Sequence, residues 1–263
     1  MNASPRATDM VEVGRLLYEK GLIASTEGNL SVRLGGDRFL LTPAGLCKGR
    51  MGTRDLVVVD GSGRRVSGDR EPTTETDLHL RIYHARPDVN AVVHAHPPTA
   101  TGFAVAGVPL ADCVLPEILV TVGSVPLAPY GTPGEADLAE KALPTAKSHD
   151  AFLLKNHGAV ALGGEIWQAF RRMEMIESFA KTLLTAKMLG RVEPLAPEEV
   201  AKLLGLRPTP PKKEGGCGGC GTCTHGGRGG CSTTAATAPP KSDEDALVAE
   251  ILRRVERRLT DSP

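Results

Sequence analysis

The sequence predicts an α/β domain, because short buried strands alternate along the chain with amphipathic helices. Ala91–Ala95 and Ala151–Leu154 are apolar runs of strand length, and two β-branched valines strengthen the first assignment. The stretch 166–189 has the length and the period of a helix. Its apolar stripe consists of Phe170, Met173, Ile176, Phe179, Leu183 and Met188. At 263 residues, the chain is long enough for one sizeable domain with appended segments.

The other elements are placed by the same signals. A helix is expected over 8–22, and Thr73 or Thr74 should cap a second helix that continues through the residues after them. The apolar run 159–162 is expected to continue the strand of 151–154. Shorter strands are expected at 38–42, 56–60 and 125–130.

The composition argues against a nucleic-acid or membrane function. Lysine plus arginine (31) balances aspartate plus glutamate (31), and aromatic residues that could stack on bases make up only 3% of the chain. No apolar run approaches membrane-spanning length, and the first residues lack the apolar core of an export signal. We therefore expect a cytoplasmic protein, in which the six cysteines are poor candidates for disulfides.

Histidines follow both apolar strands. His94 and His96 are two residues apart, so their side chains point to one side of a strand that Pro97 brings to an end. His157 occupies the same kind of position after Ala151–Leu154. Three imidazoles with an open fourth position describe a catalytic metal site, whereas structural zinc sites are closed by four protein ligands. The alternative is a set of core histidines satisfied by hydrogen bonds, but burying them without such partners is costly.

Two segments have the chemistry of anion cradles. Gly28 and Asn29 are flanked by hydroxyl residues at the entrance to a strand, although Gly-Asn is also an ordinary turn pair. Thr73 and Thr74 supply two hydroxyls at a helix start, where backbone N–H groups are free. Glu75 should lie in the first turn of that helix. It either complements the helix dipole or, if the fold brings it to the histidines, takes part in chemistry.

Six motifs together resemble a known family. They are Glu27-Gly28-Asn29-Leu30-Ser31, Thr42-Pro43-Ala44-Gly45, Thr73-Thr74-Glu75, His94-Ala95-His96-Pro97, Ala128-Pro129-Tyr130 and Asn156-His157-Gly158. Their order and spacing resemble the class II, zinc-dependent aldolases of the fuculose-phosphate aldolase and ribulose-phosphate 4-epimerase family, over about residues 11–206. The resemblance implies a three-layer α/β/α domain with a central, mainly antiparallel sheet. It also implies a homotetramer with active sites near subunit contacts.

The resemblance assigns roles to individual residues. It implies that a divalent ion, Zn²⁺ or another transition metal, is held by three ligands, and that Glu75 is the acid/base carboxylate. The implied metal ligands are His94, His96 and His157, and the implied phosphate-binding residues are Gly28, Asn29, Gly45, Thr73 and Thr74. The epimerase branch usually carries aspartate where Glu75 stands, which favours an aldolase. The family's aldolases often have a hydroxyl residue at the position of Ala44, so one phosphate contact differs here.

Two further polar residues lie between the second and third histidines. Glu117 and Tyr130 are candidates for supporting the metal ligands from outside the site, and Glu117 is alternatively only solvated.

The last part of the chain is different in composition. The domain should end at residue 207, and 208–241 is a proline-, glycine- and cysteine-rich linker. Its cysteine spacing is compatible with zinc or an iron–sulfur cluster, but the lack of apolar residues favours a flexible tether. The cysteines concerned are Cys217, Cys220, Cys223 and Cys231.

The segment 242–263 is expected to form a short amphipathic helix that docks on something else. It begins with the acidic capping sequence Ser242-Asp243-Glu244-Asp245. Its apolar stripe consists of Leu247, Val248, Ile251, Leu252, Val255 and Leu259. This segment resembles the encapsulation peptides that bring enzymes into bacterial microcompartments, which implies shell proteins as partners. The alternative is that the helix packs on its own domain or a sister subunit.

The sequence therefore predicts a metal-dependent aldolase that cleaves a ketose 1-phosphate, such as fuculose or rhamnulose 1-phosphate, into dihydroxyacetone phosphate and lactaldehyde. The enzymatic alternatives are an epimerase or a dehydratase on the same scaffold. A non-catalytic scaffold, like the head of adducin, is an alternative of another class, and the complete set of three histidines and Glu75 argues against it.

Overall fold

The structure, a computed structural model, describes residues 4–206. The linker 208–241 and the segment 242–263 lie outside the described residues, so the predictions made for both segments remain predictions. The same holds for the cysteine site, which was predicted at Cys217, Cys220, Cys223 and Cys231. Within residues 4–206, no helix is long and apolar enough to cross a bilayer.

One eight-stranded sheet forms the centre of this part of the chain, in the order β4-β3-β2-β1-β5-β8-β7-β6. Neighbouring strands are antiparallel, apart from β6 and β7, which are parallel. The strands are β1 (Asn29–Gly35), β2 (Arg38–Leu41), β3 (Val57–Asp60), β4 (Arg65–Ser67), β5 (Ala91–Ala95), β6 (Leu127–Ala128), β7 (Ala151–Leu154) and β8 (Gly158–Gly163).

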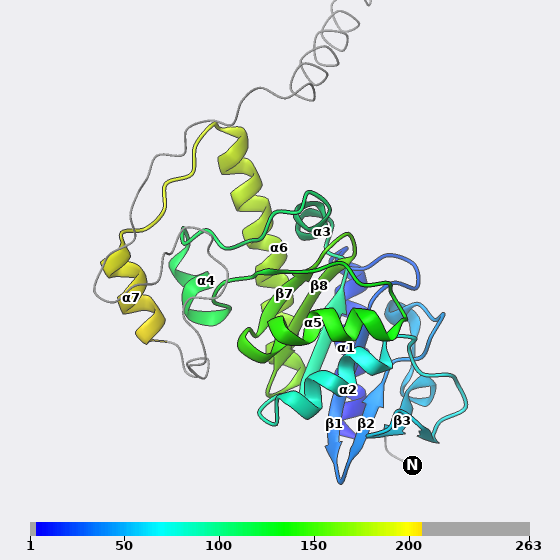
Figure 1. The fold of residues 1–263 in the computed structure, drawn as a ribbon. Helices are drawn as coiled ribbons and strands as arrows, with labels where there is room; N and C mark the ends of the chain where they lie inside the picture. The colour runs from blue at the N-terminus through cyan, green and yellow to red at the C-terminus, as the bar shows by residue number, and fades with distance from the viewer. Residues whose placement is uncertain (1–3, 207–263) are drawn as a thin grey trace, which may run out of the picture. The chain divides into compact units, whose positions relative to one another are not determined.

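Helices cover both faces of the sheet, as Figure 1 shows. On one face α2 packs against α5, and on the other α1, α3 and α6 pack together. The helices are α1 (Pro5–Glu19), α2 (Thr76–Ala85), α3 (Pro98–Val105), α4 (Pro116–Thr121), α5 (Ala136–Ser148), α6 (Ile166–Met188) and α7 (Pro197–Gly205). The three-layer α/β/α fold with a mainly antiparallel sheet is therefore confirmed.

The apolar strands are fully apolar because both of their faces are covered. Phe152 and Leu154 of β7 face the layer of α2 and α5, while Leu153 between them faces the layer of α1 and α6. In a strand that is buried on both faces, apolar and polar residues do not alternate. The strand predictions at Ala91–Ala95 and Ala151–Leu154 rest on this feature, and both are confirmed.

The prediction that 159–162 continues the strand of 151–154 is wrong, because the chain reverses between β7 and β8. Asn156 adopts a left-handed backbone conformation with φ of 56°, which asparagine tolerates better than most residues. The turn is closed by the N–H of His157, which donates to the carbonyl of Leu154 at 3.0 Å. The hairpin places His157 at its tip, beside the end of the neighbouring strand β5.

Some boundaries also differ from the predictions. Helix α1 begins at Pro5, which suits a first helical position because proline has no N–H to leave unpaired. Strand β4 and helices α4 and α7 were not predicted; the strand is short and exposed, so no apolar period marks it. Met188, predicted in the apolar stripe of α6, is 79% exposed at the helix end.

A buried carboxylate fixes the chain just after His96. Glu177 of α6 is only 3% exposed, and it accepts hydrogen bonds from the N–H of Thr99 (3.1 Å), the hydroxyl of Thr99 (2.8 Å) and the N–H of Ala100 (2.9 Å). These N–H groups are free because they begin α3. Glu177 therefore caps α3 from a different helix.

Replacing Glu177 should destabilise the fold far more than replacing an exposed neighbour. We expect Glu177→Ala to lower the free energy of unfolding by about 2 kcal/mol, because buried donors lose their acceptor. Glu174→Ala is the matched control on the same helix; its ion pair with Lys20 is solvent-exposed and should contribute less than about 1 kcal/mol. Urea unfolding of both variants is the measurement, and equal losses would contradict the capping role.

Candidate metal centre and active site

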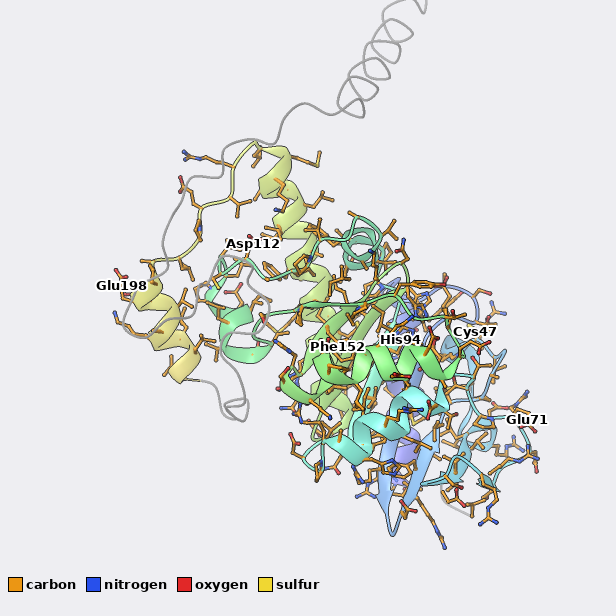
Figure 2. All side chains as sticks on the ribbon, in the orientation of Figure 1. Cys47, Glu71, His94, Asp112, Phe152 and Glu198 are labelled. Atoms are coloured by element: carbon orange, nitrogen blue, oxygen red, sulfur yellow. The ribbon has the colours of Figure 1, made fainter. Side chains whose placement is uncertain are left out.

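The three predicted histidines converge at one end of the sheet, where Figure 2 labels His94. His94 is in β5, His96 follows that strand, and His157 lies at the tip of the β7–β8 hairpin. The Nε2 atom of His94 is 3.2 Å from Nε2 of His96 and 3.3 Å from Nε2 of His157. The convergence follows from the pairing of β5 with β8, which places His94 opposite Val160, next to the hairpin.

The hydrogen bonds and burial of these histidines suit a metal ion. Nδ1 of His94 lies 2.9 Å from the carbonyl oxygen of Ala159 and must donate to it, which leaves a lone pair on Nε2. Burial lowers the pKa of His94, His96 and His157, so the neutral form that binds metals is favoured in each. Nitrogen lone pairs that face one another repel unless a cation lies between them. The residues present therefore fit a divalent transition metal.

Glu75 joins the histidines at the same centre. Its Oε2 is 3.3 Å from Nε2 of His94, and its Oε1 is 3.3 Å from Nε2 of His157. The residue is itself the N-cap of α2, so the predictions that Thr73 or Thr74 caps this helix and that Glu75 lies in its first turn are wrong by one or two residues. Its side chain is only 6% exposed. The fold thus brings the predicted carboxylate to the predicted histidines, which the sequence left open.

A row of buried polar residues behind Glu75 was not predicted. Asn29 donates from Nδ2 to Oε2 of Glu75 at 2.9 Å, and its Oδ1 is 2.5 Å from Nε2 of His79. Nδ1 of His79 is 2.6 Å from the hydroxyl of Ser31, which is 2.7 Å from the hydroxyl of Tyr83. We call these five residues, Glu75, Asn29, His79, Ser31 and Tyr83, the polar seam. Burial lowers the pKa of His79 to about 4 and raises the pKa of Tyr83.

A sequence signal for the seam exists. Glu75, His79 and Tyr83 recur at every fourth residue of α2, and Asn29 and Ser31 recur at every second residue of β1. These are the periods of one helix face and one strand face.

The predicted phosphate loops lie next to Glu75. The segment at Pro43 pairs with Pro72, and the N–H of Thr73 donates to the carbonyl of Thr42 at 3.1 Å. Gly45 has a φ of +66°, and a β-carbon there would meet nothing within 4 Å, so its backbone faces open space. Gly28 has a φ of +67°, and a β-carbon there would come within 2.7 Å of the carbonyl oxygen of His94, so only glycine fits.

The two threonines and Asn29 differ in what they can offer an anion. Thr74 is exposed, whereas Thr73 is buried and its hydroxyl lies 3.4 Å from the N–H of Glu75. Both polar ends of the Asn29 side chain are used inside the seam. The second hydrogen of Nδ2 is not used in the seam, so the Asn29 side chain keeps one donor for the predicted phosphate role.

The two other polar candidates lie at the surface. Glu117 is exposed in the first turn of α4, and Tyr130 is 48% exposed after β6. Within residues 4–206, neither side chain is hydrogen-bonded to, or stacked on, any of the three histidines. Their supporting role remains a prediction.

A buried lysine near the site was also missed. Lys48 is 3% exposed, and its Nζ donates to the carbonyl of Thr26 at 2.6 Å, which fixes the loop before Gly28. Burial lowers the pKa of Lys48, and the negative charge of Glu75 opposes that shift. In the same loop, Glu27 lies 3.8 Å from Nδ1 of His96. This loop therefore contributes charged groups on the side of His96.

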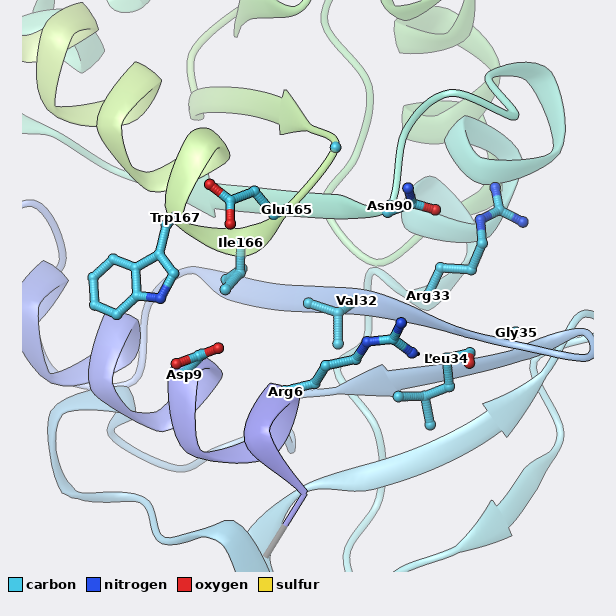
Figure 3. Close-up of a pocket in the computed structure, with 11 residues that line it drawn as sticks. Arg6, Asp9, Val32, Arg33, Leu34, Gly35, Asn90, Glu165, Ile166 and Trp167 are labelled. Atoms are coloured by element: carbon cyan, nitrogen blue, oxygen red, sulfur yellow. Dashed lines mark hydrogen bonds between the residues drawn. The ribbon is translucent and has the colours of Figure 1, made fainter.

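A separate hollow of about 410 Å³ lies at the opposite end of β1 and β5 from the histidines (Figure 3). Its lining includes Arg6, Arg33, Asn90 and Trp167. The Arg33 guanidinium already donates to the carbonyl of Tyr83 at 2.7 Å and lies over the rings of Phe39 and Tyr83. Arg33 therefore contacts Tyr83, the residue of the seam that lies farthest from Glu75.

Gly158 should be essential for the geometry of the three histidines. A β-carbon at this position would lie 2.6 Å from the carbonyl oxygen of Ala95 and 2.6 Å from Cδ2 of His96. We expect Gly158→Ala to weaken Co²⁺ or Zn²⁺ binding by about tenfold or more, because the His96 ring must move. Gly102→Ala, where a β-carbon meets nothing within 4 Å, is the control. Metal titration of both apoproteins is the measurement, and equal affinities would show that the histidines do not form the site.

Comparison with known proteins agrees with this geometry. Residues 8–184 match the family described as "Class II Aldolase and Adducin N-terminal domain". A 3-oxo-tetronate 4-phosphate decarboxylase from Pectobacterium atrosepticum is 34% identical over 201 residues, covering 74% of this chain and 90% of that protein. An L-fuculose phosphate aldolase from Methanococcus maripaludis is 33% identical, covering 66% and 93%. A solved L-fuculose 1-phosphate aldolase is 33% identical with a TM-score of 0.72, covering 77% and 96%.

These relatives are enzymes, and the family match spans the sheet, the histidines and Glu75. The chain therefore belongs to the class II aldolase family and is an enzyme of the aldolase, or lyase, type.

Proposed function

We propose that the chain is a metal-dependent aldolase that cleaves a ketose 1-phosphate, such as L-fuculose or L-rhamnulose 1-phosphate, to dihydroxyacetone phosphate and lactaldehyde. The observation that supports this most is the convergence of three imidazole nitrogens and the Glu75 carboxylate, each 3.2–3.3 Å from a neighbour in the cluster. The loops at Gly45 and Thr73 lie beside that centre. Relatives named as L-fuculose phosphate aldolases support the substrate class.

The chemistry needs a proton carrier and a way to stabilise negative charge. Breaking the C3–C4 bond requires loss of the C4 hydroxyl proton, and the electron pair of the bond passes into an enediolate at C2 and C3. A divalent ion such as Zn²⁺, held by His94, His96 and His157, supplies Lewis-acid stabilisation of that charge, which contributes several kcal/mol. Glu75 takes up the hydroxyl proton and returns a proton to C3, an effect of about 10²–10⁴ in rate. The proton balance then closes without another group.

The phosphate loops position the substrate for this step. Backbone N–H groups around Gly28 and Gly45, with the hydroxyls of Thr73 and Thr74, hold the phosphate at one end of the sugar. Binding energy from this remote group can be used to orient the scissile bond beside Glu75. The backbone N–H of Thr73 donates to the carbonyl of Thr42, which joins this residue to the loop that ends at Gly45.

Decarboxylation of a 3-oxo acid phosphate is the second candidate, and the comparisons favour it specifically. Relatives that are 34% and 35% identical are named 3-oxo-tetronate 4-phosphate decarboxylases. Loss of CO₂ from C2 of such a compound leaves an enediolate at C2 and C3, next to a phosphate-bearing carbon. The same site can stabilise this enediolate, and Glu75 can deliver to C2 a proton that it has taken up from solvent, because the substrate itself releases CO₂ and no proton. The two reactions differ in the leaving group, which is lactaldehyde in aldol cleavage and CO₂ in decarboxylation. Only aldol cleavage requires the removal of a hydroxyl proton.

Assays on a panel of sugar phosphates distinguish the candidates. The panel is L-fuculose 1-phosphate, L-rhamnulose 1-phosphate, L-ribulose 5-phosphate and 3-oxo-tetronate 4-phosphate. We expect cleavage of a ketose 1-phosphate that is lost on chelation and restored by Zn²⁺ or Co²⁺. Glu75→Gln should lower kcat by about 10²–10⁴. Glu71→Gln, at an exposed carboxylate four residues earlier, should leave kcat unchanged.

Each other outcome of these assays contradicts a stated part of the proposal. Full turnover after chelation would remove the metal from the mechanism, and normal turnover by Glu75→Gln would remove that carboxylate. CO₂ release from 3-oxo-tetronate 4-phosphate without ketose cleavage would establish the second candidate in place of the first.

We further propose that the enzyme is a homotetramer and that it is packaged in a bacterial microcompartment. The support for packaging is the acidic start and apolar stripe of residues 242–263. Deleting residues 242–263 should spare catalysis and abolish co-localisation with shell proteins, measured by co-fractionation with purified shells. Unchanged partitioning of the truncated protein would count against the targeting role.

A further inference from the structure

The polar seam lies in a place where the fold would otherwise be apolar. Ser31 and His79 are fully buried, and Tyr83 is 1% exposed. Phe39 stacks on the ring of Tyr83 at 4.9 Å, and Val92 belongs to the same buried cluster. Burying three unmatched polar side chains here would cost several kcal/mol, so the hydrogen bonds between them must be complete. The contacts of the seam show that they are.

The hydrogen bonds of the seam can run in only one sense. The Glu75 carboxylate only accepts, so the NH₂ group of Asn29 must face it and the Asn29 oxygen must face His79. That oxygen also only accepts, so Nε2 of His79 must carry a hydrogen.

The far half of the seam follows from the same rule. Burial keeps His79 neutral, so its Nδ1 accepts from the hydroxyl of Ser31. The Ser31 oxygen then accepts from the hydroxyl of Tyr83. Each of these four hydrogen bonds is therefore donated in the same direction, from Tyr83 at one end of the seam toward Glu75 at the other.

We infer that His79 is a positioning residue for Glu75, which acts through Asn29 by holding the amide so that its NH₂ group faces the carboxylate. Without a donor at Nε2 of His79, the buried oxygen of Asn29 is left unpaired, which costs free energy. The amide then shifts toward another donor, and the Glu75 carboxylate that it holds moves with it, away from the histidines. The inference rests on the proposed function where it concerns turnover.

This role separates the seam from the predicted phosphate loops. The Asn29 side chain belongs to the acid/base group, because one hydrogen of Nδ2 holds Oε2 of Glu75 while Oε1 remains directed at His157. Gly28, Gly45 and Thr74 of the phosphate loops lie outside the seam. Damage to the seam should therefore reach the chemical step and leave phosphate binding in place.

Steady-state kinetics of three variants test this separation. We expect His79→Leu to lower kcat by about 10- to 100-fold, with KM for the sugar phosphate changed by less than about twofold. His79→Gln retains a side-chain N–H for Asn29 and should stay within about threefold of the unsubstituted protein. Leu78→Ala is the matched control, because it removes a buried side chain from the adjacent position of α2 outside the seam. A kcat for His79→Leu equal to that of Leu78→Ala would overturn the inference.

Cobalt binding tests the inference without any substrate. The Glu75 carboxylate adds negative charge at the histidines, so losing its position should weaken Co²⁺ binding by about tenfold in His79→Leu and leave the Gln and Leu78→Ala variants unchanged. Co²⁺ is titrated into each apoprotein and followed by its visible absorption. Equal affinities in His79→Leu and Leu78→Ala would refute the positioning role, whatever the substrate. If no sugar phosphate is turned over but the cobalt pattern holds, the proposed function fails and the inference stands.

Ser31→Ala provides a second route if His79→Leu does not fold. This substitution leaves the buried Nδ1 of His79 without its donor, so the ring is no longer held in the position from which Nε2 donates to Asn29. We expect kcat and Co²⁺ affinity to fall together by about three- to tenfold, and no change in either would contradict the inference.

Discussion

The burial of the Glu75 carboxylate is the constraint on which the rest of this site depends. A carboxylate with 6% of its surface exposed must be matched by donors and by positive charge, since desolvation costs several kcal/mol. Asn29 supplies one donor, and the three histidines provide a place for a cation on the other side. The sheet satisfies both requirements, because β1 and β5 are neighbours and bring Asn29 opposite His94.

This constraint explains why a polar seam crosses an apolar layer. Once Asn29 is committed to Glu75, its oxygen needs a donor, and His79 fills that need; His79 in turn needs Ser31. Ser31 is in turn hydrogen-bonded to Tyr83, whose ring lies under the Arg33 guanidinium. On the other face of the sheet, Glu177 is a second buried carboxylate, and it accepts three hydrogen bonds from the start of α3. One carboxylate contacts His94 and His157, and the other holds the chain just after His96.

A site of this kind stabilises an anion rather than a particular substrate. Aldol cleavage and decarboxylation both leave an enediolate beside a phosphate-bearing carbon, and they differ mainly in what departs. This common intermediate accounts for a family whose members include L-fuculose phosphate aldolases and 3-oxo-tetronate 4-phosphate decarboxylases at similar identity to this chain. The fold brings together the three histidines and Glu75, the residues to which we assign metal binding and proton transfer, and these roles are common to both candidate reactions.

The sequence by itself determined the α/β class, the buried strands and the three histidines, because apolar runs and their terminal residues are local signals. It also indicated Glu75 and the phosphate loops through the resemblance. Only the tertiary structure decided that β7 and β8 form a hairpin, since a single left-handed residue, Asn156, reverses a run of apolar residues. It alone joined Glu75 to His94 and His157, and it alone assembled Asn29, His79 and Ser31. The contacts Asn29–Glu75, Ser31–His79 and Asn29–His79 link residues 46–50 positions apart, and the long-range pairing of strands and helices, rather than local preference, brings them together.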